Sequence, residues 1–88
     1  MRLRFTSEVK VDNSTGDLQL TAYVGNVPVR CIVKRSAVAA GLSTSYLSDG
    51  QILDLYHARR SQIQSIASLR FENGERQPTV SYRDMTTH

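Results

Sequence analysis

Residues 47–74 constrain the fold most strongly, because they have the pattern of one long amphipathic helix with both ends marked. Ser48, with Gln51 three residues later, has the pattern of a capping box, and the pair Asn73 and Gly74 is typical of a helix stop. Between these signals the apolar side chains fall within about 60° of one line on the helix. The stretch therefore predicts a helix of about 22 residues that packs on a sheet.

Three runs of alternating apolar and polar residues precede this helix and predict strands at 2–11, 18–24 and 27–33. The last two runs are separated only by Gly25 and Asn26, which predicts a hairpin with a two-residue loop. In the first run, one apolar position is occupied by serine.

Short elements complete the expected fold. Ser36 has the pattern of a cap for a short helical turn, and residues 79–82 alternate as a fourth strand that pairs with strand one or strand three. Residues 85–88 are expected to be a frayed tail. We therefore expect one α+β domain, residues 1–88: a small antiparallel β-sheet (β-β-β, short α, long α, β) with one long helix packed on one face.

Composition narrows the class of protein. The chain has 88 residues and a net charge of +3, and its apolar runs fall far short of the roughly 20 residues that a membrane span needs. Its single cysteine, Cys31, cannot form a disulfide within the chain, which favours a reducing compartment. We expect a cytoplasmic protein with no membrane partner.

No pattern of catalytic or ligand-binding residues stands out. Cys31 alternates with apolar residues and is expected in the core, where a thiol is inert. Asp54 and His57 offer only two groups for a metal, and a surface pair explains them better. We expect no enzyme activity, no cofactor, no metal and no small-molecule ligand.

Arg59 is the one charged residue inside the predicted apolar stripe, and Arg60 follows it. One interpretation is that the Arg59 head reaches the sheet edge or pairs with Glu8 or Asp84 while its methylenes pack. The other is that Arg59 and Arg60 mark a surface that binds a partner.

The outward face of the predicted sheet is basic. Single-stranded nucleic acid binds such faces through cations and stacking aromatics, but here only one aromatic is available. The residues of this candidate face are Arg2, Arg4, Tyr23, Arg30 and Lys34.

Open sheet edges also invite a protein partner, a second copy included. Pro28 lacks a backbone donor and predicts an open edge at the start of the third strand.

Residues 29–38 and 56–67 resemble segments of a family of small, mostly proteobacterial proteins classed as a domain of unknown function. The similarity covers residues 17–84 and implies an α+β fold with a helix on one face of a small antiparallel sheet. The family has no assigned activity, so the resemblance implies no functional residue. We therefore expect a non-enzymatic binding or protein-interaction module of a bacterial cytoplasm, with a nucleic-acid-binding domain as the alternative.

Overall fold

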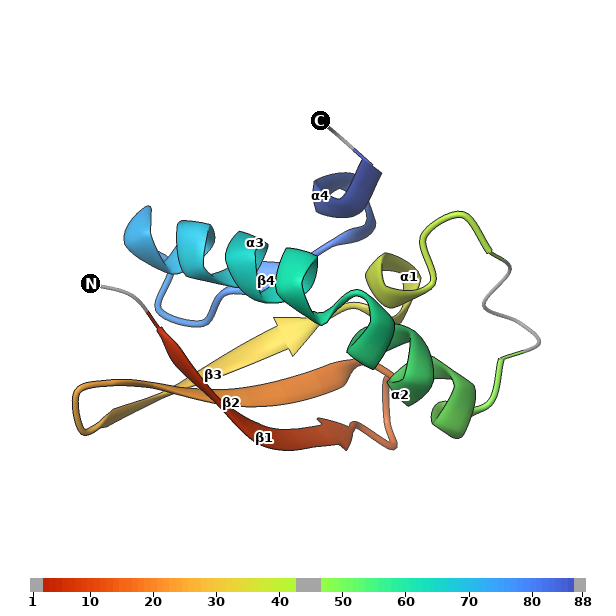
Figure 1. Ribbon diagram of the computed structural model, residues 1–88, viewed down its shortest axis with the longest axis horizontal. Helices are drawn as coiled ribbons and strands as arrows, with labels where there is room; N and C mark the ends of the chain where they lie inside the picture. The colour runs from red at the N-terminus through yellow and green to blue at the C-terminus, as the bar shows by residue number, and fades with distance from the viewer. Residues whose placement is uncertain (1–2, 43–46, 87–88) are drawn as a thin grey trace.

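The computed structural model describes residues 3–42 and 47–86 and shows a four-stranded sheet with helices on one face (Figure 1). Across the sheet lie, in order, β1 (Arg4–Val11), β2 (Leu18–Val24), β3 (Val27–Val33) and β4 (Thr79–Val80). The helices are α1 (Arg35–Val38), α2 (Asp49–Ala58), α3 (Arg60–Glu72) and α4 (Tyr82–Thr86). The predicted α+β fold is confirmed.

The first three strands form the predicted antiparallel meander. Val24 pairs with Val27, so the hairpin between β2 and β3 has the two-residue loop that the sequence indicates. Gly25 has a φ of +59°, a conformation that glycine adopts without steric cost. The tight loop thus fixes the register of the two central strands.

A bulge interrupts β1 around Ser7, the serine in its otherwise apolar face. Phe5 pairs with Ala22 and Val9 with Leu20, so three residues of β1 face one residue of β2. Because two residues are added, Phe5 and Val9 keep the same side of the sheet. The side chain of Thr6 fills the gap by donating to the carbonyl oxygen of Thr21 at 3.1 Å.

The fourth strand makes the sheet mixed rather than purely antiparallel. β4 pairs with β3, in parallel, at Ile32 and Val33 only. The parallel direction follows from the helical crossover that returns the chain. Residues 27–31 are left as an open edge, as Pro28 predicts.

The predicted long helix is two helices, α2 and α3, broken at Arg59. Both predicted ends are confirmed: Ser48 and Gln51 form the capping box, and Gly74, with a φ of +102°, follows the last turn. Arg59 has φ −107° and ψ 12°, outside the helical region. Its side chain donates hydrogen bonds to carbonyl oxygens at the end of α1, and the helical pattern of the sequence gives no sign of this tertiary contact.

The short helical turn is present as α1, but the cap predicted at Ser36 is wrong. Ser36 is the second residue of α1, and Asp17 accepts the N–H of Arg35 at its start with a distance of 3.0 Å. The carboxylate comes from the loop before β2, so it caps this helix from a distant part of the chain.

The chain end also differs from the prediction. The fourth strand stops at Val80, and residues 82–86 form α4 with Met85 only 7% exposed. Asp84 accepts hydrogen bonds from the N–H and the hydroxyl of Ser81, and these bonds stabilise the start of a helix at the next residue. Residues 85 and 86 are therefore ordered, while residues 87–88 of the expected tail lie outside the described part.

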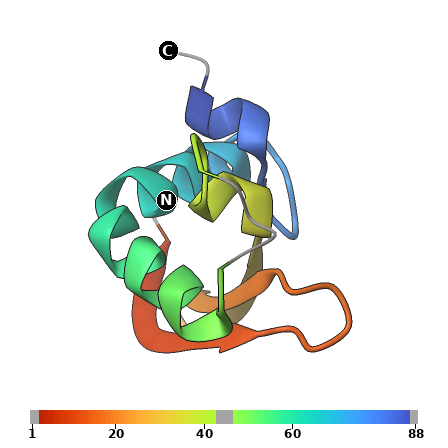
Figure 2. The same ribbon diagram turned by 90° about the vertical axis from the view of Figure 1, so that its right-hand side faces the viewer.

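The core lies between the sheet and the helices. Helices α1, α2 and α3 lie over one side of the sheet in both views (Figures 1 and 2). β2 and β3 contribute a row of buried side chains, and the helices cover them. The largest fully buried side chains are Leu18, Leu20, Ile52, Ile63, Val33, Val38, Val80, Pro78 and Cys31. No helix of the described chain covers the other face.

Candidate functional site

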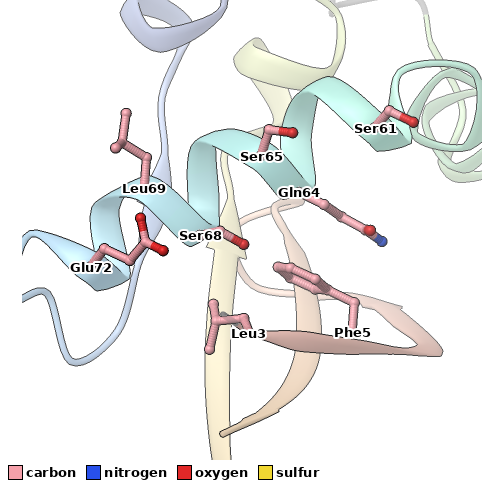
Figure 3. Close-up of a pocket in the computed structure, with 8 residues that line it drawn as sticks. All are labelled: Leu3, Phe5, Ser61, Gln64, Ser65, Ser68, Leu69 and Glu72. Carbon is pink, nitrogen blue, oxygen red and sulfur yellow. The ribbon is translucent and has the colours of Figure 1, made fainter. Parts of the chain in front are cut away.

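A groove separates the edge strand β1 from α3. One hollow in this groove has a volume of about 560 Å³, and Leu3, which precedes β1, and Phe5, in β1, form one of its walls (Figure 3). The opposite wall belongs to α3, and Gln64 extends from it toward Phe5. The lining residues are Leu3, Phe5, Ser61, Gln64, Ser65, Ser68, Leu69 and Glu72.

The groove continues toward the junction of α2 and α3. A second hollow of about 480 Å³ shares four of the same lining residues and adds His57 and Arg60 at its far end. We call the two hollows together the β1–α3 groove, lined by the residues above and by Thr6, Ser7, Tyr56, His57 and Arg60.

The helical period explains how α3 forms this wall. Ile63 and Ala67 are fully buried against the sheet, so the residues on the opposite side of α3 point away from the core. Several of those are serines, whose short side chains leave space beside the helix. Leu69 also points outward and is 57% exposed. The result is an apolar floor with a polar rim.

One polar side chain in the groove is held in place. The amide nitrogen of Gln64 donates to the hydroxyl oxygen of Tyr56 at 3.2 Å. Tyr56 is only 3% exposed, so its ring belongs to the core while its hydroxyl reaches the groove wall.

The ends of the groove carry opposite charges. Arg60 lies at one end and Glu72 at the other. Both side chains are exposed, and neither has a hydrogen bond or ion pair with any residue in 3–42 or 47–86. These two charges are available to a partner.

The structure separates the two arginines that the sequence analysis grouped. Arg59 reaches neither the sheet edge nor Glu8 nor Asp84. Its Nη1 donates to the carbonyl oxygens of Val38 at 2.9 Å and Ala40 at 3.0 Å. Arg59 therefore joins the α2–α3 break to the end of α1, whereas Arg60 lies on the groove rim.

The structure brings together some, but not all, of the residues of the predicted basic face. Arg4 and Tyr23 are register partners, and Arg30 is exposed opposite Thr21, two residues along β2 from Tyr23. Lys34 donates to the Asp17 carboxylate at 3.2 Å, so it is already engaged at the end of the sheet. Arg2 lies outside the described residues.

Asp17 is the centre of a polar cluster that the sequence analysis missed. One of its oxygens accepts from Lys34 and the other from the Arg35 backbone. The Arg35 side chain then donates to the Leu47 carbonyl at 2.6 Å and to Asp49 at 3.0 Å. The cluster ties the β1–β2 loop to the starts of α1 and α2, and no local pattern marks it.

A second missed cluster surrounds Arg70. Its guanidinium donates to both oxygens of Asp84 and to Glu75. These hydrogen bonds, first from Asp84 and then from Glu75, raise the pKa of Arg70 above its ordinary value. The spacing of Ser81 and Asp84 is that of a capping box and could have indicated the helix start.

Asp84 is held ionised by the same contacts. Burial alone would raise its pKa, but hydrogen bonds from Arg70 and Ser81 outweigh burial and hold the pKa of the carboxyl below its ordinary value. Its oxygens are occupied by these donors, so the cluster serves to fix α4 against α3.

Cys31 occupies the core position that its strand pattern predicts. It is fully buried, and burial raises the pKa of its thiol to about 11. The thiol is therefore neutral near pH 7. In the described ranges, no three His, Cys, Asp or Glu side chains are placed to hold a metal ion, and no helix is long and apolar enough to span a membrane.

Comparison with known proteins supports the fold and the family. A crystal structure of a protein of unknown function from the DUF1488 family of Shewanella loihica PV-4 aligns with a TM-score of 0.78. It is 18% identical, and the alignment covers 90% of this chain and 91% of that one. No curated protein matches the sequence. The family described as "Protein of unknown function (DUF1488)" matches residues 3–83, and the chain therefore belongs to this family.

Proposed function

We propose that the protein is a non-enzymatic interaction module of the bacterial cytoplasm that binds a protein partner in the β1–α3 groove. The main support is the apolar floor of this groove, where Leu3 and Phe5 line a hollow that no described element fills and Leu69 is exposed on its α3 side. An apolar centre with a polar rim is the usual anatomy of a protein interface.

The shape of β1 favours contact through side chains over addition of a strand. The bulge between Phe5 and Val9 interrupts the row of backbone groups that an added strand would need. On the other wall α3 is a helix of 13 residues, and its Ser61, Ser65 and Leu69 are exposed. A partner would therefore lie along α3 and contact the apolar floor from there.

Blocking the groove tests this function. Ser65 is exposed on α3, so Ser65→Arg should leave the fold unchanged while its long side chain occupies the groove. Ser36→Arg makes the same change at an exposed position of α1 that does not line the groove. Tagged wild-type, S65R and S36R proteins would be purified from native cells after nuclease treatment.

We expect wild type and S36R to retain the same protein partner and S65R to lose it. Equal recovery of that partner with S65R would contradict binding in the groove. Far-UV circular dichroism and urea unfolding of each variant confirm that any loss is not a loss of folding.

The open face of the sheet supports a second candidate, binding of single-stranded nucleic acid. Arg4, Lys10 and Arg30 are exposed on β1 and β3, against one acidic side chain, Glu8. The side chains of Arg30 and Lys10 have no hydrogen bond or ion pair within the described residues. Tyr23 is the aromatic residue available there for stacking, so phosphate contacts would dominate.

A matched pair of charge reversals tests the second candidate. Arg30→Glu and Arg60→Glu change the net charge equally, but only Arg30 lies on the open sheet face. If nucleic acid binds there, R30E should weaken binding of random single-stranded DNA at low salt and lower its salt dependence, while R60E should not. Equal effects of both variants, or no binding by wild type, would contradict this candidate.

A further inference from the structure

The end of the β1–α3 groove at the α2–α3 junction carries an unpaired positive charge. Arg60 lines this hollow with a guanidinium, a group that can only donate hydrogen bonds. Neither Glu8 of β1 nor Asp54 of α2 lines it, and the acidic side chain that does line the groove, Glu72, belongs to the other hollow. In the described part of the chain, the Arg60 side chain has no hydrogen bond or ion pair. The hollow therefore has a cation and no carboxylate of its own.

Tyr56 adds a second donor, and this donor comes from the core. The residue is only 3% exposed, and its hydroxyl oxygen accepts a hydrogen bond from the Gln64 amide at 3.2 Å. That bond uses a lone pair of the oxygen, so the hydroxyl proton remains to be donated, and none of the described residues accepts it. A buried donor at the wall of a hollow favours a ligand that supplies an acceptor.

We propose that this end of the groove binds a carboxylate, and that the partner in the groove is a protein segment with an acidic side chain beside an apolar one. This assignment rests on the proposed protein-binding function of the groove. A carboxylate has two acceptor oxygens that match the paired donors of a guanidinium, so it satisfies Arg60 and leaves an acceptor site for the Tyr56 hydroxyl. The apolar neighbour then lies against Phe5, which lines both hollows.

The shape of the groove favours a protein segment over a free small acid. The hollow of about 480 Å³ beside Arg60 and the larger one of about 560 Å³ share four lining residues, so the two adjoin. Leu3 and Phe5 are among the shared residues, and a small acid beside Arg60 would leave the larger hollow unfilled. A segment that fills both hollows buries apolar surface and shields the carboxylate from water, which strengthens its attraction to Arg60.

Two substitutions separate the carboxylate contact from the rest of the groove. Arg60→Ala removes the positive charge and Arg60→Glu reverses it, and both leave the apolar floor unchanged. Ser65→Arg, in contrast, obstructs the groove and keeps Arg60. The Arg60 and Ser65 side chains are exposed and have no hydrogen bond in the described chain, so all three variants should fold, which urea unfolding checks.

Selection from a random peptide library displayed on phage tests the assignment with the full chain. Wild type should select peptides in which Asp or Glu recurs beside an apolar residue, and R60E should select peptides with Lys or Arg at that place. S65R should select neither kind.

One selected acidic peptide, and the same peptide with its carboxylate replaced by the amide of Asn or Gln, are then compared by fluorescence anisotropy. The replacement should weaken binding to wild type about tenfold, because a shielded contact between carboxylate and guanidinium is lost. It should weaken binding to R60A less than about twofold, because that contact is already absent.

Selected peptides without enrichment of acidic residues, or an amide replacement that weakens binding to wild type and R60A equally, would overturn the carboxylate assignment. If those peptides still failed to bind S65R, the proposed function would stand, whereas peptides that bind S65R as well as wild type would contradict both. Failure to select any peptide would also overturn the assignment, and random single-stranded DNA that binds wild type and R30E but not R60E would then place a phosphate beside Arg60.

Discussion

Arg59 should be among the most important side chains for stability even though it carries a charge. Its Nη1 bonds to two carbonyl oxygens near the end of α1, and one of them belongs to Val38, which is fully buried. Arg59→Ala removes this donor and leaves both oxygens without it. The same substitution at Arg60, which is exposed on the groove rim, removes no side-chain hydrogen bond or ion pair within the described residues.

The expected loss follows from the contacts. A hydrogen bond to a charged group contributes about 1.5–3 kcal/mol, and here one nitrogen serves two acceptors in a partly buried setting. We therefore expect Arg59→Ala to lower the free energy of unfolding by about 2–3 kcal/mol. A domain of this size has roughly 4–13 kcal/mol in total, so the melting temperature should fall by roughly 10–20 °C. Arg60→Ala should change the free energy of unfolding by less than about 0.5 kcal/mol.

Equilibrium urea unfolding of wild type, R59A and R60A measures the difference directly. Arg59→Lys adds a second comparison, because lysine keeps the charge but not the planar donor geometry, and its stability should lie between wild type and R59A. Equal free energies of unfolding for R59A and R60A would refute the conclusion that Arg59 links α1 to the α2–α3 break.

Three further outcomes follow from the local contacts. Asp84→Asn should lower the free energy of unfolding at neutral pH, as measured by urea unfolding at several pH values. Because folding lowers the pKa of Asp84, the difference in free energy between wild type and D84N should shrink as the pH falls below about 4. Ser48→Ala removes the capping hydrogen bond to the Gln51 N–H and should cost about 1 kcal/mol by the same assay, and an unchanged midpoint would contradict the cap. Cys31 should react with a thiol reagent at pH 8 only as fast as the protein unfolds, and rapid reaction of the native protein would contradict its burial.

Local patterns were sufficient for the elements whose causes are local. The capping box at Ser48, the helix stop at Gly74 and the hairpin at Gly25 each involve residues within a few positions of one another. Alternation placed Cys31 in the core for the same reason. These features could be predicted because the groups that interact are neighbours in the sequence.

The features that were missed depend on contacts between distant residues. The helix breaks at Arg59 where its side chain bonds to carbonyls 19 and 21 residues away, and Arg70 bonds to Asp84 across 14 residues. Helical periodicity reports only on residues a few positions apart, so it could not indicate either of these contacts. The last strand was predicted too long because Tyr82 continues the alternation, while the capping of Ser81 by Asp84 starts a helix.

The candidate site could be predicted only in part. Arg60 was identified as a surface residue, but as a companion of Arg59 and not as one end of a groove. The groove exists because α3 passes beside the edge strand, which places Ser68 near Leu3 across the structure (Figure 3). A serine on an amphipathic helix has the pattern of an ordinary solvated position, so the sequence offered no sign of a hollow there.

Site-specific photocrosslinking inside native cells tests the central claim most directly. A photoreactive amino acid would replace Ser65 in the groove and, as the matched control, Ser36 on α1. Binding in the groove predicts a covalent protein adduct from position 65 and none from position 36. If the partner is a second copy, the adduct from position 65 should have twice the mass of the chain. No adduct at position 65, or equal adducts at both positions, would contradict the account.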